Sequence, residues 1–291
     1  MGDLLAIIGG DLRIINLAKI LAKEKNIITF GQELAHGIEE GEKIVKEAKD
    51  LKSAVENAKT IIGPIPLSKD GETVHAEFSK NKILLKDLIK YVKGKTLIAG
   101  AVPQKIYNLA QANNVKIIDL MKDETLTVLN TIATAEGAVA IAIQRTKRIL
   151  QGSNVLILGF GRVGKVVAKK FAALNSKVTC AARKLEDFAW MQVCGYNYTN
   201  INNLGANLKD YDIIINTAPA LILTEERLKY VKKDCLIIDL ASKPGGVDVL
   251  AAEKLGLNFE WALALPGKVA PITAAKHIKD TLDKVINLEE K

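Results

Sequence analysis

Short apolar runs recur along this chain and alternate with longer segments whose apolar residues have helical spacing. In the first half the apolar runs occupy residues 3–10, 26–30, 60–63, 96–99 and 115–119. The helical segments between them lie at residues 14–23, 84–92 and 104–112. Strands that alternate with helices form a parallel sheet with helices on both faces. We therefore predict a doubly wound α/β domain over residues 1–125.

Two polar segments interrupt this alternation. Residues 37–58 are charged and compatible with a helix. Residues 68–82 are polar and follow the third predicted strand, so we expect a long loop there. Open α/β sheets bind ligands beyond the carboxyl ends of their strands. The loop is therefore a candidate part of a substrate site, and we predict that residues 1–125 form a flavodoxin-like substrate domain.

A second α/β domain is predicted after a long helical pattern. Residues 124–150 carry this pattern, which polar residues could interrupt near 134–137. We expect an interdomain helix over 126–150, with a cleft beside it. Strands are then predicted at residues 155–159, 177–181, 196–199, 212–216, 235–240 and 259–262. Six strands favour a Rossmann domain over 151–270 with strand order 3-2-1-4-5-6, and we expect a last helix, 271–291, to fold back on the first domain.

The first strand of the second domain ends in a glycine-rich turn. The residues of this turn are Gly159, Phe160, Gly161, Arg162, Val163 and Gly164, and a helical pattern follows. The first glycine allows a tight turn, the second lets the backbone approach a pyrophosphate, and the third lets helix and strand pack closely. The first N–H groups of the helix then face the anion. This context predicts a dinucleotide site.

The next strand indicates which dinucleotide binds. NAD sites usually carry an acidic residue at the end of this strand, where it accepts a hydrogen bond from the ribose 2′-hydroxyl. Here Ala181 and Ala182 occupy that region, and Arg183 and Lys184 follow. An arginine binds a 2′-phosphate in a bidentate way, and the lysine adds a positive charge. We predict NADP over NAD; the alternative is that Arg183 covers the adenine ring, as it can in NAD enzymes.

Two later strand ends are predicted to pass along the cofactor. The first lies near its ribose and the second near its nicotinamide. In that order they are Thr217, Ala218 and Pro219, then Leu240, Ala241 and Ser242. Residues 243–248 follow with two glycines, and they form either a plain turn or a catalytic part.

Polar residues in apolar surroundings are candidates for substrate chemistry. Lys268 lies in a segment rich in Pro and Gly, which we expect to be a rigid loop, and its ammonium would pair with a substrate carboxylate. Arg13 follows two glycines after the first strand and is a second candidate anchor. The interdomain helix adds Thr134, Glu136 and Gly137, where the carboxylate faces either solvent or the cleft.

Metal and thiol chemistry are not predicted. The three histidines have no metal-ligand spacing, and each is expected to be a surface or packing residue; only His75, in the long loop, is a candidate base to test. The three cysteines are odd in number and include no C-x-x-C pair. This pattern fits a reducing cytoplasm and neither a disulfide framework nor a zinc site.

The charge pattern limits the classes of partner. The net charge is +8, from 41 Lys and Arg residues against 33 Asp and Glu. The two signs are interleaved, which favours a solvated lysine-rich surface over nucleic-acid binding and would also attract anionic substrates. The first residues show no signal-peptide pattern, and the apolar stretch near 138–143 is too short for a membrane span. We expect a cytoplasmic protein with neither a nucleic-acid nor a membrane partner.

Several motifs, taken together, resemble one family. They are residues 9–13 (GGDLR), 63–66 (GPIP), 134–138 (TAEGA), 265–271 (LPGKVAP) and the glycine turn. In this order they resemble the dipicolinate synthase A subunit family of endospore-forming bacteria. More distantly the chain is similar to 2-hydroxyacid dehydrogenases, alanine dehydrogenase and adenosylhomocysteinase, which share the two-domain plan.

The resemblance implies a function. It implies a dehydrogenase-like subunit that works with a second, flavoprotein-like B subunit in the mother cell of a sporulating bacterium, and we also expect contacts between copies of the chain. The two subunits would oxidise a dihydrodipicolinate-type product of the lysine pathway, a small dicarboxylate, to dipicolinate with hydride transfer to the cofactor. Lys268 and Arg13 would anchor carboxylates, while Thr134 and Glu136 would orient the ring or relay a proton, with Gly137 beside them.

Two other functions stay open. One is a stand-alone NADP-dependent dehydrogenase of hydroxy acids or amino acids, although its usual catalytic residues are not recognisable around 242–248. The other is a non-catalytic nucleotide sensor, which would leave the site-like loop of the first domain unexplained.

Overall fold

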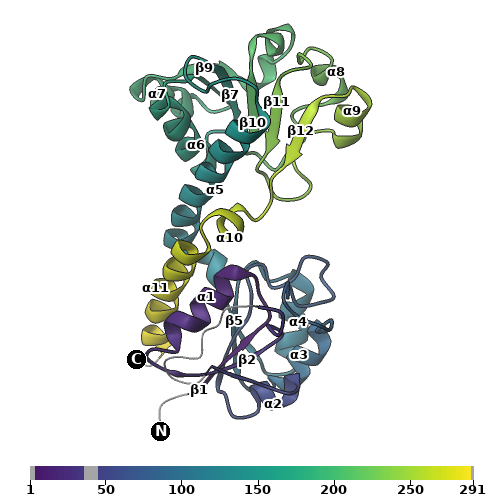
Figure 1. The fold of residues 1–291 in the computed structure, drawn as a ribbon, viewed down its shortest axis with the longest axis vertical. Helices are drawn as coiled ribbons and strands as arrows, with labels where there is room; N and C mark the ends of the chain where they lie inside the picture. Colours follow the sequence, from purple (N-terminus) through teal and green to yellow (C-terminus); the bar gives the residue numbers. More distant parts are fainter. Residues whose placement is uncertain (1–3, 36–44, 290–291) are drawn as a thin grey trace. The chain divides into compact units, whose positions relative to one another are not determined.

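The chain folds into two compact units (Figure 1). The computed structural model describes residues 4–35 and 45–289. The first unit comprises Met1–Leu129 and Ala270–Lys291, and the second comprises Asn130–Val269. The boundary falls inside the long helix α5 (Glu124–Arg145), so this helix contributes to both units.

A six-stranded parallel sheet forms the centre of the first unit. Its strands are β1 (Leu4–Ile8), β2 (Asn26–Phe30), β3 (Val45–Glu47), β4 (Thr60–Ile62), β5 (Thr96–Ala99) and β6 (Lys116–Asp119). They lie in the order β3-β2-β1-β4-β5-β6. Alternate side chains of β1 enter two different cores, Leu5 and Ile7 on one face and Ala6 and Ile8 on the other. Both faces of the sheet are therefore covered, as the apolar runs predict.

Helices cover both faces of this sheet. The helices of one face are α1 (Leu12–Leu21) and α11 (Pro271–Glu289), and those of the other are α2 (Leu51–Val55), α3 (Leu85–Tyr91) and α4 (Gln104–Ala112). A short 3-10 helix, η1 (Leu120–Lys122), leads from β6 toward α5. α11 packs against α1 (Figure 1), where Ile278 and Leu282 are buried against Leu17 and Leu21. The last helix is thus part of the first unit.

The prediction of one helix over residues 37–58 is wrong within the described part of that segment. Residues 36–44 lie outside the described residues; after them come β3 and the short α2. Asp50 caps α2, since its carboxylate accepts a hydrogen bond from the Ser53 N–H at 2.8 Å. A three-residue edge strand is too short to show a period of two, which is why the sequence conceals β3. Without β3, the other five strands keep the flavodoxin-type order.

The second unit repeats this architecture. Its strands are β7 (Asn154–Leu158), β8 (Lys177–Ala182), β9 (Asn197–Asn200), β10 (Ile213–Asn216), β11 (Leu236–Asp239) and β12 (Asn258–Trp261). Their order, β12-β11-β10-β7-β8-β9, is the predicted Rossmann order, and all pairs are parallel. The intervening elements are α6 (Arg162–Ala173), α7 (Leu185–Val193), η2 (Ile201–Asn203), η3 (Ala206–Asp210), α8 (Glu225–Leu228), α9 (Val249–Lys254) and α10 (Leu265–Val269).

Helix α5 runs without a break, so the possible interruption near residues 134–137 does not occur. The Thr134 hydroxyl donates to the Asn130 carbonyl at 2.9 Å, and this bond accommodates the polar side chain within the helix. The helix ends at Arg145 rather than at residue 150. By length and mean hydropathy (1.6 over 18 residues) it could cross a membrane, but buried helices of soluble proteins pass the same test. Ala135, Ala138 and Ala142 belong to the core of the second unit.

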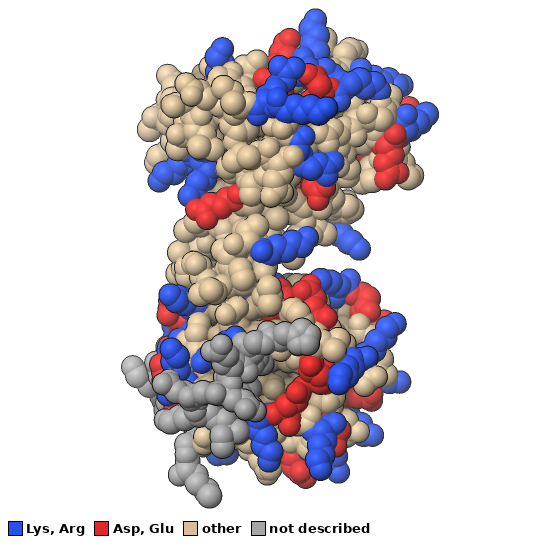
Figure 2. Space-filling model, in the orientation of Figure 1, with Lys and Arg blue, Asp and Glu red and all other residues tan. Residues whose placement is uncertain are grey.

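Charged side chains of both signs are interspersed on both units. Figure 2 shows Lys and Arg beside Asp and Glu over most of the charged surface on the face in view. Several of these neighbours are ion pairs, such as Arg145 with Glu260 at 2.5 Å and Lys232 with Asp212 at 2.6 Å. The positive net charge is therefore distributed, and it marks no single basic patch on this face.

The packing of α11 on α1 predicts the effect of shortening a buried side chain. We expect Leu282→Ala to lower the free energy of unfolding by about 2–5 kcal/mol, because Leu282 is fully buried and its loss leaves a cavity. Lys276→Ala, on the exposed side of the same helix, should change it by less than about 0.5 kcal/mol. Urea unfolding of both variants measures this, and equal effects would contradict the packing.

Candidate functional site

The glycine turn between β7 and α6 is built around close contacts. Gly159 has φ +95°, and a Cβ there would lie 2.7 Å from the Thr217 hydroxyl. A Cβ on Gly164 would lie 2.3 Å from the Gly159 carbonyl oxygen. Side chains at these two positions are therefore excluded by the fold itself, and the strand can turn directly into the helix.

The second glycine of the turn has a different environment. A Cβ on Gly161 would meet no atom within 4 Å, so the fold alone does not require glycine there. Gly161 is also the N-cap of α6, and no side chain caps the first N–H groups of this helix. Open space beside uncapped N–H groups at a helix N-terminus fits a bound phosphate. Phe160 is buried and packs edge-to-face on Tyr196, so it supports the turn from below.

Two basic residues follow the end of β8. Ala181 and Ala182 are buried in the sheet, whereas Arg183 and Lys184 are exposed. Neither basic side chain forms a hydrogen bond or ion pair with a described residue. Both are therefore available to a ligand at the strand end where dinucleotides place their adenosine ribose.

A buried polar pair holds the two later strand ends together. The Asn216 amide donates to the Asp239 carboxyl at 2.7 Å, and both side chains are fully buried. The Asp239 carboxyl also accepts hydrogen bonds from the N–H groups of Ala241 (2.9 Å) and Gly246 (2.7 Å), while Asn216 donates to the Ala218 carbonyl. The pair thus fixes both loops that were predicted to line the cofactor.

Sequence reasoning missed this pair. It named the residues after each strand and overlooked the polar residue at each strand end. The available signal was Asn216 after four apolar residues and Asp239 at the end of a similar run, because a polar residue at the carboxyl end of a buried strand needs a partner. Gly246 completes the arrangement, since a Cβ there would lie 2.3 Å from the Asn216 amide nitrogen.

The two most specific motifs meet within the second unit. Gly137 of α5 faces Leu265 of α10, and a Cβ on Gly137 would lie 3.0 Å from a Leu265 methyl carbon. Leu265 shares a core with Ala135 and Ala138. The glycine therefore lets α10 approach α5 closely.

The segment around Lys268 differs from its predicted form. Residues 265–269 form the short helix α10 instead of a rigid loop, because Pro266 lies in its first turn, where a missing N–H costs nothing. Lys268 is exposed at the end of this helix, and no described residue pairs with its ammonium. It is therefore available to a ligand.

The other proposed substrate residues already have partners. Glu136 is exposed and forms an ion pair with Lys170 of α6 at 2.7 Å. In the first unit, Arg13 is buried, and its guanidinium donates to both oxygens of Asp11 (2.7–3.1 Å) and to the Ile65 carbonyl. Arg13 therefore also secures the turn after β1.

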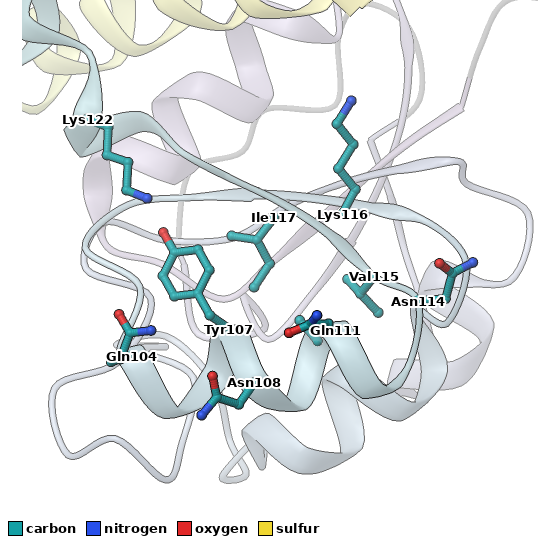
Figure 3. Close-up of a pocket in the computed structure, with 10 residues that line it drawn as sticks. Gln104, Tyr107, Asn108, Gln111, Asn114, Val115, Lys116, Ile117 and Lys122 are labelled. Carbon is teal, nitrogen blue, oxygen red and sulfur yellow. The ribbon is translucent and has the colours of Figure 1, made fainter.

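A large hollow of the first unit lies away from all these residues. A pocket of about 560 Å³ follows α4 and β6, and its described lining includes none of the predicted site residues. Figure 3 shows Tyr107 and Lys122 pointing toward each other in it, with the ammonium 4.7 Å from the ring centre. Within the part of the chain that the structure describes, no group of three His, Cys, Asp or Glu residues could hold a metal ion.

Comparison with known proteins places this geometry in a family. Residues 4–121 match the model of the N-terminal domain of the dipicolinate synthase A subunit. The dipicolinate synthase A subunit of Bacillus subtilis (strain 168) is 32% identical over 287 residues, which cover 97% of this chain and 95% of the relative. The chain belongs to the dipicolinate synthase A subunit family. The crystal structure of the corresponding protein from Bacillus halodurans covers 98% of both chains with a TM-score of 0.89 and 32% identity.

The second unit of this family member is dehydrogenase-like. Residues 140–254 match the model of shikimate / quinate 5-dehydrogenase, a region that includes the glycine turn and both loops held by Asp239. L-alanine dehydrogenase shares the fold, with a TM-score of 0.65 at 16% identity over 99% of this chain and 90% of that one. The predicted family and fold class are thus confirmed.

The glycine turn of this family member predicts two separable effects. Gly164→Ala should lower the free energy of unfolding by about 1–3 kcal/mol, because its Cβ collides with a backbone carbonyl. Gly161→Ala should cost less than about 1 kcal/mol, the usual range for an N-cap. It should nevertheless weaken dinucleotide binding at least about tenfold, because its Cβ would occupy the phosphate's place.

Urea unfolding and calorimetric titration with NADP distinguish these effects. If Gly161→Ala bound NADP as tightly as the unaltered chain, the phosphate would not lie at this turn.

Proposed function

We propose that this chain is the dehydrogenase-like subunit of a dipicolinate synthase. It oxidises a dihydrodipicolinate-type precursor to pyridine-2,6-dicarboxylate with NADP as hydride acceptor. The observation that carries the proposal is the strand end at Arg183 and Lys184, which offers two unpaired cations beside a phosphate-binding glycine turn. The relatives are named as one lettered component of a synthase, which supports a partner protein, and we propose that this partner is flavoprotein-like.

The residues present fit a dinucleotide. The open side of Gly161 and the N–H groups at the start of α6 would hold the pyrophosphate. The loops that begin at Thr217 and Leu240 would border the ribose and the nicotinamide, because Asp239 fixes them at the carboxyl ends of adjacent strands. When bound, the nicotinamide supplies the hydride acceptor.

Phosphate recognition favours NADP over NAD. An acidic residue at the end of β8 would repel a 2′-phosphate, and two alanines stand there instead. Arg183 can donate two parallel hydrogen bonds to phosphate oxygens, and Lys184 adds a second positive charge. The first acidic residues after β8, Glu186 and Asp187, lie in the first turn of α7, beyond these cations.

The substrate residues are assigned by charge and availability. Lys268 is exposed and has no described partner, so it is the stronger candidate for a carboxylate of the substrate. Arg13 would contribute through the part of its guanidinium that Asp11 does not hold. Thr134 and Glu136 would orient the ring or relay the proton released on oxidation, and Glu136 would then exchange its contact with Lys170.

The cofactor assignment predicts a selective loss of affinity. Arg183→Ala should weaken NADP binding by about tenfold or more, because charge-assisted hydrogen bonds to the 2′-phosphate are lost. NAD binding should change by less than about twofold, a small difference in binding free energy. Lys177→Ala, at the opposite end of the same strand, serves as the control and should alter neither. Calorimetric titration measures all four affinities; tighter binding of NAD than NADP by the unaltered chain would contradict the assignment.

The reaction itself predicts dependence on Lys268. With the flavoprotein-like partner present, purified chain and NADP should form dipicolinate, observed by its absorbance. Lys268→Ala should raise KM for the substrate by about tenfold or more through the lost charge pair. Lys169→Ala, exposed on α6, should leave it unchanged.

Other outcomes of this assay favour the other functions. NADP binding without turnover, with or without the partner protein, would favour a nucleotide sensor. Turnover of a hydroxy acid or amino acid by the chain alone would favour a stand-alone dehydrogenase.

A further inference from the structure

Two buried polar atoms of the first unit have no hydrogen-bond partner. They are Oε1 of Gln32 and Nδ1 of His75, and the two residues are 3% and 7% exposed. Buried polar atoms almost always have a partner, because leaving water without one is costly. Such an exception indicates that another molecule supplies the missing bond.

Both side chains adjoin the glycine pair at the end of β1. The Gln32 amide donates to the Gly9 carbonyl at 2.9 Å, and the Gly10 N–H donates to the His75 carbonyl at 2.8 Å. Gly9 has φ +62°, and a Cβ there would lie 2.9 Å from the same His75 carbonyl. The glycines therefore allow the loop of residues 68–82 to lie directly on the strand end. This is the edge of a parallel sheet where ligands bind.

The two unpaired atoms are both hydrogen-bond acceptors. Gln32 uses its NH₂ group toward Gly9, so the oxygen is the atom left over. Nε2 of His75 lies 3.2 Å from a Glu77 carboxylate oxygen, which only accepts, so Nε2 carries the proton of the neutral ring. Burial, and next the nearby Lys69, lower the pKa of His75, whereas Glu77 and Asp11 act in the opposite direction. Nδ1 therefore presents a lone pair.

The surroundings are positively charged. His75 and Glu77 line a pocket of about 350 Å³ together with Lys69, Lys80 and Lys82. Lys69 forms an ion pair with Glu77 at 3.2 Å, so the other two ammonium groups exceed the acidic charge of the described lining. Such a pocket favours an anionic ligand.

We propose that Gln32 and His75 form a binding site for a carboxylate-bearing compound with a hydroxyl or ring N–H group. Gln32 Oε1 and His75 Nδ1 accept hydrogen bonds from the donor group, and the lysines attract the carboxylates. That this compound is the substrate of the oxidation rests on the proposed function. The unoxidised ring would then be recognised by its donor groups, which the aromatic product at neutral pH does not have.

Two matched ring compounds test the site without any turnover. Piperidine-2,6-dicarboxylate carries a protonated ring nitrogen with N–H donors, and pyridine-2,6-dicarboxylate carries the same carboxylates with no ring donor. We expect the full chain to bind the first compound at least about tenfold more tightly, and His75→Phe and Gln32→Leu each to remove most of this preference. Binding of the pyridine compound should change less than about threefold.

A conservative variant and a spectroscopic signal keep the test independent of stability. His75→Asn retains an acceptor near the position of Nδ1 and should restore part of the preference, whereas His277→Asn, on α11, should have no effect. The ¹⁵N resonance of His75 Nδ1 should shift on addition of the piperidine compound. If Gln32→Leu fails to fold, the His75 variants and this resonance decide the outcome.

The site and the proposed function fail in different ways. Equal binding of both compounds, with no shift of the Nδ1 resonance, would show that only water occupies the two acceptors and would overturn the site. A preserved preference without formation of dipicolinate would support the site and contradict the proposed function. Turnover that is unchanged in the His75 and Gln32 variants would overturn the site as the substrate's position.

Discussion

The absence of a side chain at a few strand ends is the constraint on which both units depend. The Gly159 carbonyl lies where a Cβ of Gly164 would be, and the His75 carbonyl lies where a Cβ of Gly9 would be. Each contact lets the chain leave a buried strand and pack at once against a helix or a loop. The polar backbone groups of that strand end therefore stay at the surface of the sheet, where a ligand can use them.

Carboxyl groups then hold the loops that leave these strand ends. Asp239 accepts hydrogen bonds from Asn216 and from two backbone N–H groups in the following loop. In the first unit, Asp70 organises the loop of residues 68–82, and its hydrogen bonds, first of all from Thr73, hold its pKa well below the ordinary value. One acidic side chain thus replaces the ladder of a regular element, which gives an irregular loop a defined shape.

The sequence predicts the repeated parts of this structure well. The fold class, the Rossmann strand order and the glycine turn follow from apolar runs and glycine spacing, because buried parallel strands and their turns leave strong local patterns. It predicts β3 and α10 poorly, since three to five residues are too few to show a period. It also misses Asn216 and His75, whose importance depends on partners distant in the sequence. The interdomain helix is predicted as longer than α5, because residues 146–150 continue the pattern after the helix has ended.

The two sheets have the same strand order but treat the first helix after the central strand differently. In the second unit, Gly161 caps α6 with no side chain, so the helix N-terminus can receive a phosphate. In the first unit, Asp11 caps α1 with its own carboxylate, and Arg13 neutralises that charge. An anion is thus already present at this second N-terminus, and a dinucleotide phosphate would be repelled from it. The first unit is left with the acceptors of Gln32 and His75, which suit a donor-bearing small molecule, and duplication of one fold therefore yields two different kinds of site.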